Sequence, residues 1–189
     1  MTGGLGAGKS TALAGLERLG AAVLSTDAVV HELYASDAVR EAVRARLGPE
    51  VVRDGRVDRA AVARRVFADE ADRRWLEGLL WPLVGERVAA FRAAAGARVP
   101  VPPVVVIETP LLFEAGLADA YDATIAVVAD DDLRETRAGG RGHEALAERE
   151  RRQLSQEEKA RRATHVVHNS GSLEELEHRL GEVLAQLIG

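Results

Sequence analysis

A glycine-rich stretch near the beginning of the chain holds residues that are suited to binding phosphate groups. It reads Gly3-Gly4-Leu5-Gly6-Ala7-Gly8-Lys9-Ser10-Thr11. The order of Gly, four residues, Gly, Lys and then Ser or Thr is the pattern of a phosphate-binding loop. Glycine permits the torsions that turn backbone N–H groups toward an anion, and the helix that follows adds the positive end of its dipole. The stretch therefore predicts a site for the phosphates of a nucleotide.

The side chains at the end of this loop have separate predicted roles. The ammonium of Lys9 reaches the β- and γ-phosphates of ATP, the Ser10 hydroxyl completes the oxygen shell of a bound Mg²⁺, and Thr11 lies near the α-phosphate. The alternative is a flexible, glycine-rich terminus. Against it, residues at helical spacing follow the loop directly and end at a glycine: Ala12, Leu13, Leu16, Leu19 and Gly20.

Lysine is rare in this chain. Of 25 Lys and Arg residues, only Lys9 and Lys159 are lysines. A sequence that uses Arg almost everywhere has placed Lys where a compact point charge is needed. This usage supports a specific role for Lys9.

A carboxylate, Asp27, follows a short apolar run at residues 21–24 that predicts a parallel strand. Neighbouring strands lie about 4.8 Å apart, so a carboxylate two strands from the loop sits about 10 Å away from it. That reach allows Asp27 to hold an acceptor hydroxyl near a γ-phosphate. The alternative is that Asp27 only caps the helix that follows.

Three more charged residues are candidates for the same site. Glu108 ends an apolar strand predicted at residues 101–107, where it either holds a water on Mg²⁺ or faces solvent.

Arg137 and Arg141 are four residues apart, hence neighbours on a helix face, and glycines flank them. They predict a mobile lid at about residues 137–150 that brings cations onto the transferring phosphate. The alternative for this segment is a solvated basic turn.

The remaining elements alternate between strands and helices. Further strands are predicted at residues 123–128 and 165–167. Helices are predicted at residues 28–34, 37–47 after Ser36, 59–67 after Asp58, 70–80 after Asp69, 82–95 from Pro82, and 144–153. Capping boxes start two more, at Ser155 with Glu158 and at Ser172 with Glu175. The order predicts a doubly wound α/β domain with ligands at the carboxyl ends of its strands. Because only Met1 and Thr2 precede Gly3, we expect the first strand to be truncated.

Composition limits the class of protein. The 189 residues suit a single domain, and 47% hydrophobic with 29% charged residues is typical of a soluble globular protein. The net charge of −5 argues against bulk nucleic-acid binding. No apolar run approaches the roughly 20 residues of a membrane span. The absence of Cys fits the cytoplasm, and the five His residues show no metal-ligand spacing.

The whole chain resembles the dephospho-CoA kinase family. The opening at residues 2–11 and the segment 23–27, which ends in Asp27, are similar to that family's phosphate loop and acceptor-orienting strand. Residues 55–59, with Val66 and Phe67, resemble its helical insertion. The segment 110–114, reading Pro-Leu-Leu-Phe-Glu, is close to a family signature, and Gln153, Ser155 and residues 169–172 resemble its closing segments. The chain departs from the family's usual residues at Ser25, His31, Trp81, Thr164 and His168, and the lid is about three residues short.

The resemblance implies an ATP-dependent kinase that phosphorylates the ribose 3′-hydroxyl of dephospho-CoA. It implies a sheet of five parallel strands, a core of residues 1–27 and 99–189, an acceptor-binding insertion at about 28–98, and the lid. Residues 4–11 and Asn169 then bind ATP, Lys9, Arg137 and Arg141 neutralise developing charge, and Asp27 accepts or aims the hydroxyl proton. ATP and dephospho-CoA would be the partners, and we expect a monomer.

Two other interpretations stay open at this point. One is another small kinase on the same fold, acting on a nucleoside monophosphate or a small hydroxy acid. The other is a nucleotide-binding switch or an inactive relative, which the truncated first strand and the altered acidic positions would favour.

Overall fold

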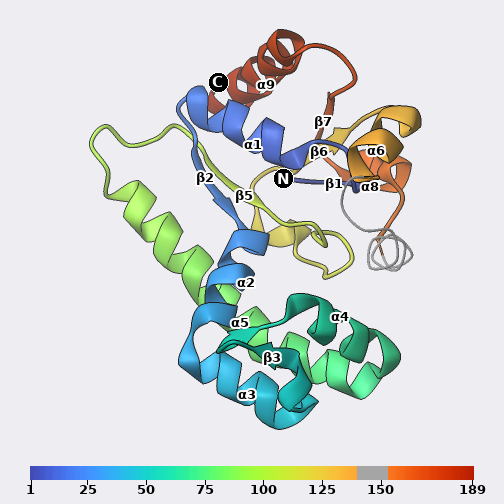
Figure 1. The fold of residues 1–189 in the computed structure, drawn as a ribbon. Helices are drawn as coiled ribbons and strands as arrows, with labels where there is room; N and C mark the ends of the chain where they lie inside the picture. The colour runs from blue at the N-terminus through green and yellow to red at the C-terminus, as the bar shows by residue number, and fades with distance from the viewer. Residues whose placement is uncertain (140–152) are drawn as a thin grey trace. The chain divides into compact units, whose positions relative to one another are not determined.

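The computed structural model describes residues 1–139 and 153–189 of the chain. Within them the backbone divides into two compact units, one formed by Met1–Ser25 with Arg92–Gly189 and the other by Thr26–Phe91. Figure 1 shows the elements of both units. The phosphate loop lies in the first unit, whereas Asp27 lies in the second.

Parallel strands form the centre of the first unit. A three-stranded sheet has the order β1-β6-β7, and a two-stranded sheet pairs β2 with β5. Every one of these pairings is parallel. The bounds are β1 Thr2–Gly3, β2 Ala22–Ser25, β5 Val105–Glu108, β6 Ile125–Val128 and β7 His165–His168.

Met1 connects the two sheets. Its amino group donates to the Ile107 carbonyl at 2.7 Å, and its carbonyl accepts from the Thr109 N–H at 2.9 Å. Ile107 and Thr109 flank Glu108, the last residue of β5. In a parallel ladder, one residue bonds in this way to the two neighbours of its partner residue. The strands therefore follow the order β2-β5-β1-β6-β7, and the predicted doubly wound α/β fold is confirmed. The first strand, β1, has two residues.

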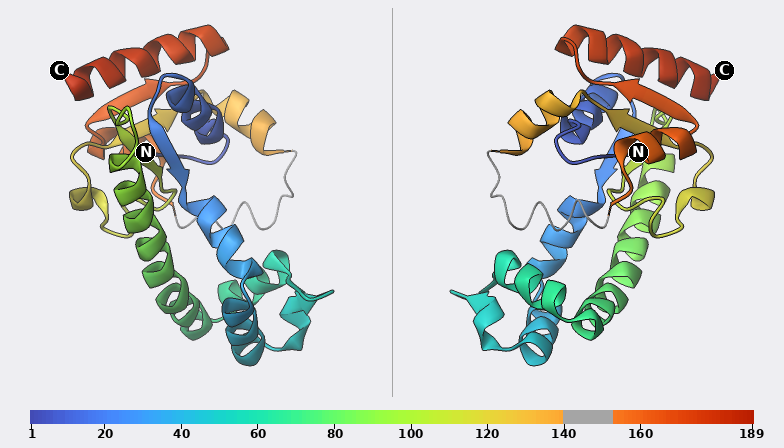
Figure 2. Two further views of the ribbon diagram at one scale, coloured as in Figure 1. Left: turned by 90° about the vertical axis from the view of Figure 1, so that its left-hand side faces the viewer. Right: turned by 90° about the vertical axis from the view of Figure 1, so that its right-hand side faces the viewer.

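Helices cover both faces of these strands. α1 packs against α9, and α9 runs beside β7 (Figure 2). Leu16, Leu180 and Val127 are fully buried in the core on this face. α8 packs against β1 and β6 on the opposite face, because right-handed crossovers that run in opposite directions along a sheet use opposite faces. The bounds are α1 Lys9–Arg18, α6 Asp131–Ala138, α8 Gln156–Arg162, α9 Leu173–Ile188 and the 3₁₀ helix η2 Ala118–Ala120.

The second unit is helical and contains one β-hairpin. Its elements are α2 Thr26–Ala35, α3 Asp37–Leu47, η1 Pro49–Val51, β3 Val52–Arg53, β4 Arg56–Val57, α4 Arg59–Ala68 and most of α5 Glu70–Gly96. The hairpin turns at Asp54 and Gly55, which have φ angles of 49° and 72°. An Asp-Gly pair is a strong local signal for such a turn. The buried carboxylate of Asp72 on α5 contacts Arg46 of α3 at 2.9 Å and Arg65 of α4 at 3.1 Å.

Most of the predicted helix starts are confirmed by their caps. The Ser36 hydroxyl accepts from the Val39 N–H, and the Asp58 carboxylate accepts from the N–H groups of residues 60 and 61. Ser172 and Glu175 form the complete capping box of α9. Ser155 caps α8 by accepting from the Glu158 N–H, but the Glu158 carboxylate pairs with Arg161 and Arg162 instead of closing the box.

The two largest errors in the predicted boundaries both involve proline. α5 is one helix from Glu70 to Gly96 with Pro82 inside it, where two helices were predicted. The proline removes one intrahelical N–H, yet the helix continues on both sides of it. β5 begins at Val105 rather than at residue 101 because Pro102 and Pro103 cannot donate to a strand ladder. The helix predicted at residues 144–153 falls almost wholly outside the described residues.

Candidate active site

The phosphate loop connects β1 to α1, and close contacts at its glycines leave no room for a Cβ there. The Ala7 N–H donates to the Gly4 carbonyl at 3.3 Å. Gly6 and Gly8 have φ angles of 73° and 84°, which residues with a Cβ rarely adopt. A Cβ on Gly8 would overlap the Asn169 side-chain amide. The glycines of the sequence pattern are therefore needed for torsion and for packing.

Lys9 is the first residue of α1, and its side chain folds back over the loop. Its Nζ donates to the carbonyls of Gly3 and Gly4, at 3.1 Å each. Ser10 and Thr11 follow in the first turn of α1 with exposed side chains. The first N–H groups of a helix have no intrahelical acceptor and carry its positive partial charge. An anion in the loop would thus meet backbone N–H groups, an ammonium and a hydroxyl.

Three side chains from later in the chain lie at the loop. Two of them bond to loop carbonyls, and the third bonds to the backbone of one of these two residues. Asn169, directly after β7, donates from Nδ2 to the Ala7 carbonyl at 2.8 Å. Arg137 of α6 donates from Nη1 to the Asn169 carbonyl at 3.0 Å, and Arg134 of α6 donates from Nε to the Leu5 carbonyl at 3.0 Å. The structure therefore brings Asn169 and Arg137 to the loop. Arg134 was not among the predicted site residues, because its only signal in the sequence is its place one helical turn before Arg137.

The carboxyl ends of β2 and β5 bring Ser25 and Glu108 together. The two residues pair in register, and the Ser25 hydroxyl donates to Glu108 Oε2 at 2.6 Å. Glu108 is buried, with 6% of its surface exposed, so the alternative of a carboxylate facing solvent is wrong. β5 is the neighbour of β1, so Glu108 lies at the strand edge from which the phosphate loop leaves.

A second buried charge, Lys159 of α8, lies behind the end of β5. Its Nζ donates to the Pro110 carbonyl at 2.6 Å and contacts Glu114 Oε1 at 3.0 Å. Burial lowers the pKa of Lys159, while the bond to Glu114 and the charges of Glu114 and Glu108 act in the opposite direction. In the sequence Lys159 stands out only because lysine is rare, and no role follows from that rarity.

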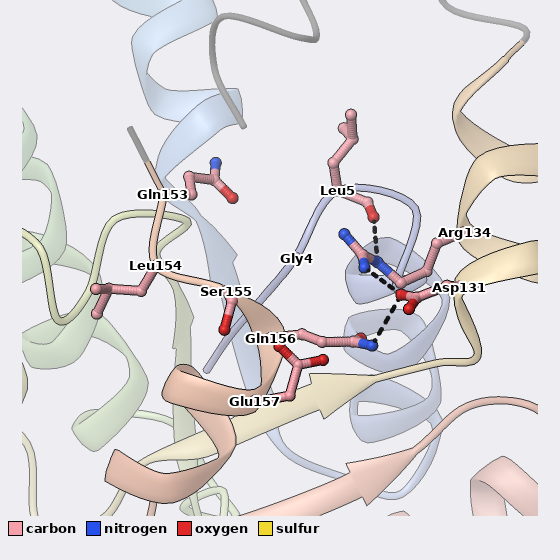
Figure 3. A pocket seen from close by; sticks show the side chains of 9 residues that line it. All are labelled: Gly4, Leu5, Asp131, Arg134, Gln153, Leu154, Ser155, Gln156 and Glu157. Carbon is pink, nitrogen blue, oxygen red and sulfur yellow. Dashed lines mark hydrogen bonds and ion pairs between the residues drawn. The ribbon is translucent and has the colours of Figure 1, made fainter. Parts of the chain in front are cut away.

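A pocket of about 280 Å³ lies beside the first half of the phosphate loop. Figure 3 shows that residues from the loop, from α6 and from the start of α8 line it. Asp131 accepts from Arg134 at 2.7 Å and from Gln156 at 3.3 Å at its side. The lining residues are Gly4, Leu5, Asp131, Arg134, Gln153, Leu154, Ser155, Gln156 and Glu157.

Asp27 and Arg141 are the two remaining predicted site residues. Asp27 is in the first turn of α2 with an exposed side chain, one residue inside the helix and not at its cap. It belongs to the second unit. Arg141 lies outside the described residues, as does the predicted lid beyond residue 139.

Nothing in the described part of the chain is built to cross a membrane, since no helix there is both long and apolar enough. The first unit has parallel strands in doubly wound order and a glycine loop that leads from a strand into a helix beginning at Lys9. These features define a phosphate-loop kinase fold.

Comparisons with known proteins agree with this class. The family model for dephospho-CoA kinase matches residues 1–175. A dephospho-CoA kinase from Deinococcus radiodurans is 43% identical, over 99% of this chain and 90% of the relative. One from Thermus thermophilus is 39% identical, over 100% of this chain and 91% of the relative. The chain belongs to the dephospho-CoA kinase family, and the resemblance seen in the sequence is confirmed.

Solved structures give the same result for the fold. A crystal structure of a Thermus thermophilus protein has a TM-score of 0.81 at 40% identity, and the match covers 100% of this chain and 96% of that one. A dephospho-CoA kinase from Campylobacter jejuni has a TM-score of 0.69 at 21% identity, covering 98% and 94%. The second likeness supports the fold alone.

Proposed function

We propose that this chain transfers the γ-phosphoryl group of ATP to the ribose 3′-hydroxyl of dephospho-CoA, giving CoA and ADP. The observation that carries the proposal is the phosphate loop, with Lys9 Nζ held 3.1 Å from two loop carbonyls at the start of α1. Family membership supports the choice of acceptor. In this proposal ATP and dephospho-CoA are the partners of a monomeric, cytoplasmic enzyme.

In the proposed mechanism the loop binds the polyphosphate and Lys9 moves from its carbonyl partners to the β- and γ-phosphates. The loop fits such a group, because the positive φ angles of Gly6 and Gly8 and the close contacts of these glycines with Arg134 and Asn169 fix the backbone conformation that turns N–H groups inward. Arg137 lies beside the loop and, with Arg141, neutralises charge on the transferring group. Asn169 serves nucleotide binding through its bond to the loop. Mg²⁺ fits the exposed Ser10 hydroxyl, with Glu108 acting through a water, and would neutralise phosphate charge.

Asp27 is proposed to orient the acceptor hydroxyl and to accept its proton. The bond from the 3′ oxygen to the γ-phosphorus forms while the bond from that phosphorus to the bridging oxygen of ADP breaks. Support comes from the exposed carboxylate of Asp27, two residues beyond the end of β2. We also propose that residues of about 28–98 bind the acceptor and that segment 137–150 closes over the nucleotide.

Release of ADP across a panel of acceptors tests this function. We expect ADP release with dephospho-CoA and none with AMP, CMP or a small hydroxy acid, and ³¹P NMR of the product should show a phosphomonoester on the 3′ oxygen. Activity with the other acceptors alone would favour a different small kinase. ADP binding without acceptor-dependent ADP release would favour a nucleotide-binding switch.

Gly8 provides a test of the loop by itself. Replacing Gly8 with Ala would place a Cβ against Asn169 at a φ of 84°. The Gly8 N–H would then no longer point at the phosphates, so one hydrogen bond would be lost. A hydrogen bond to a charged group is worth about 10- to 100-fold in affinity. We expect calorimetry to show ADP binding weakened to that extent.

Gly20 supplies the matched control, because its φ is 94° but a Cβ there would have no neighbour within 4 Å. Gly20→Ala should lower stability through backbone strain and leave the Kd for ADP unchanged. Equal ADP affinity in Gly8→Ala and the natural chain would contradict the proposed role of the loop.

A further inference from the structure

Two side chains hydrogen-bond to alternate carbonyls of the phosphate loop from outside the loop. Arg134 Nε donates to the Leu5 carbonyl at 3.0 Å, and Asn169 Nδ2 donates to the Ala7 carbonyl at 2.8 Å. The bonds join the loop to residues 129 and 162 positions later in the chain. The loop is therefore held by two elements that are distant from it in the sequence, α6 and the segment after β7.

These bonds fix the direction of two N–H groups. In a trans peptide the C=O and the following N–H point in opposite directions. A Leu5 carbonyl held outward by Arg134 turns the Gly6 N–H toward the inside of the loop. In the same way, Asn169 on the Ala7 carbonyl turns the Gly8 N–H inward. The positive φ angles of Gly6 and Gly8, 73° and 84°, belong to this alternating arrangement.

Arg134 is itself held in place by a carboxylate on its own helix. Its Nη1 donates to Asp131 at 2.7 Å, and 18% of its side-chain surface is exposed. Asp131 also accepts from Gln156, whose side-chain oxygen accepts from the Ala129 N–H at 3.2 Å. Figure 3 shows Asp131 between Arg134 and Gln156, with Arg134 directed at Leu5.

Close packing of Arg134 against the loop adds to these hydrogen bonds. A Cβ on Gly4 would lie 3.1 Å from Arg134 Nη2, and a Cβ on Gly6 would overlap the Arg134 carbonyl oxygen. α6 thus lies directly against the loop at this residue. A guanidinium can hold this position because its planar fork bonds a carbonyl and a carboxylate at once.

We propose that Arg134 is a positioning residue, which sets the Gly6 N–H for phosphate binding by holding the Leu5 carbonyl. It acts through the loop and not as a cation on the phosphate, and Asn169 does the same for Gly8. The inference rests on the proposed function only in assuming that the loop binds nucleotide phosphates.

Calorimetry with ADP and with inorganic pyrophosphate tests the proposal. Arg134→Ala should weaken both ligands by about 10- to 100-fold, the value of one hydrogen bond to a charged group. In amide NMR titrations with pyrophosphate, the Gly6 signal should lose most of its shift while the Gly8 signal keeps it. Asn169→Ala should give the reverse pattern. A purely structural role would disturb both signals together and would overturn the proposal.

Asp131→Ala separates positioning from charge by the sign of its effect. Removing an acid near an anion site should tighten pyrophosphate binding if charge alone matters, whereas loss of the anchor of Arg134 should weaken it several-fold. Asp132→Ala is the matched control, because it removes the same charge from the same turn of α6 with an exposed side chain. Binding by Asp131→Ala that equals or exceeds that of Asp132→Ala would overturn the proposal.

These measurements stand apart from the test of the proposed function. Pyrophosphate binding requires no acceptor, so a chain that failed to phosphorylate dephospho-CoA could still show the Gly6 effect. Conversely, an active kinase in which Arg134→Ala binds pyrophosphate normally would keep its function and lose this inference.

Discussion

Replacing Asp27 with asparagine is expected to lower kcat for dephospho-CoA phosphorylation by about 10²- to 10⁴-fold, the usual contribution of a positioned general base. Asparagine keeps the size of the side chain but cannot accept the hydroxyl proton. Asp27 lies in the first turn of α2 with its side chain exposed, and it belongs to a different compact unit from the phosphate loop. The substitution leaves the phosphate loop and Lys9 unchanged, so the Kd for ATP should stay unchanged.

The measurement is steady-state ADP release at saturating ATP and dephospho-CoA, combined with calorimetry for ATP. Asp37→Asn is the control, because Asp37 is also an exposed acid in the first turn of a helix of the second unit. It should cost no more than its exposed ion pair with Arg40, which is worth about 0–1 kcal/mol of stability. Near-full turnover by Asp27→Asn with intact ATP binding would remove Asp27 from the mechanism.

The parts of this molecule that sequence predicts well are those whose contacts are local. The caps at Ser36, Asp58 and Ser172 depend on N–H groups two or three residues away, so a short pattern contains all the information. The phosphate loop is similar, because one contiguous stretch supplies its glycines and Lys9. Its location at the start of α1 followed directly from the spacing of those residues.

The parts that sequence missed depend on distant partners or on competition between neighbours. Arg134 reads as one more arginine on a helix until the fold brings it to Leu5, 129 residues earlier. Pro82 reads as a helix start because position N1 favours proline, yet α5 has good helix formers on both sides and continues through it. The hairpin turn at Asp54 and Gly55 had a local signal that the helical pattern around it concealed.

Glu108 shows that strand position and burial are separate questions. The apolar run before it correctly placed it at the end of a strand, but sequence left open whether it faces solvent. Its burial follows from pairing β5 between β2 and β1, and that order is set by contacts across the whole first unit. Ser25 then becomes its hydrogen-bond donor, because the two residues share a register.

Lys159→Met is expected to destabilise the fold strongly. Lys159 is fully buried and contacts Glu114 at 3.0 Å, so methionine of similar length would leave the Glu114 carboxylate without its cation. Breaking a buried ion pair from one side lowers the free energy of unfolding by about 3–5 kcal/mol. For a chain of this size, that corresponds to a fall in Tm of about 6–20 °C.

The double variant Lys159→Met/Glu114→Gln should recover much of this loss, because no unpaired charge stays buried. Glutamine keeps an oxygen for the Leu154 N–H, which donates to Glu114 Oε1 at 2.8 Å. Arg161→Met is the control on the same helix. Its pair with Glu158 is exposed, so its removal should cost about 0–1 kcal/mol. A double variant no more stable than Lys159→Met would contradict the ion-pair account.

The stability difference between the natural chain and Lys159→Met should depend on pH, and the direction follows from the pKa of Lys159. Burial lowers the pKa of Lys159 from the ordinary value of 10.5, so between the lowered pKa and 10.5 the unfolded chain binds more protons at this residue than the folded chain. Stability contributed by Lys159 therefore rises with pH through that window. Denaturant unfolding of the natural chain and of Lys159→Met at several alkaline pH values should show their stability difference increasing. A difference that shrinks over this range would mean that pairing with Glu114, and not burial, dominates the ionisation of Lys159.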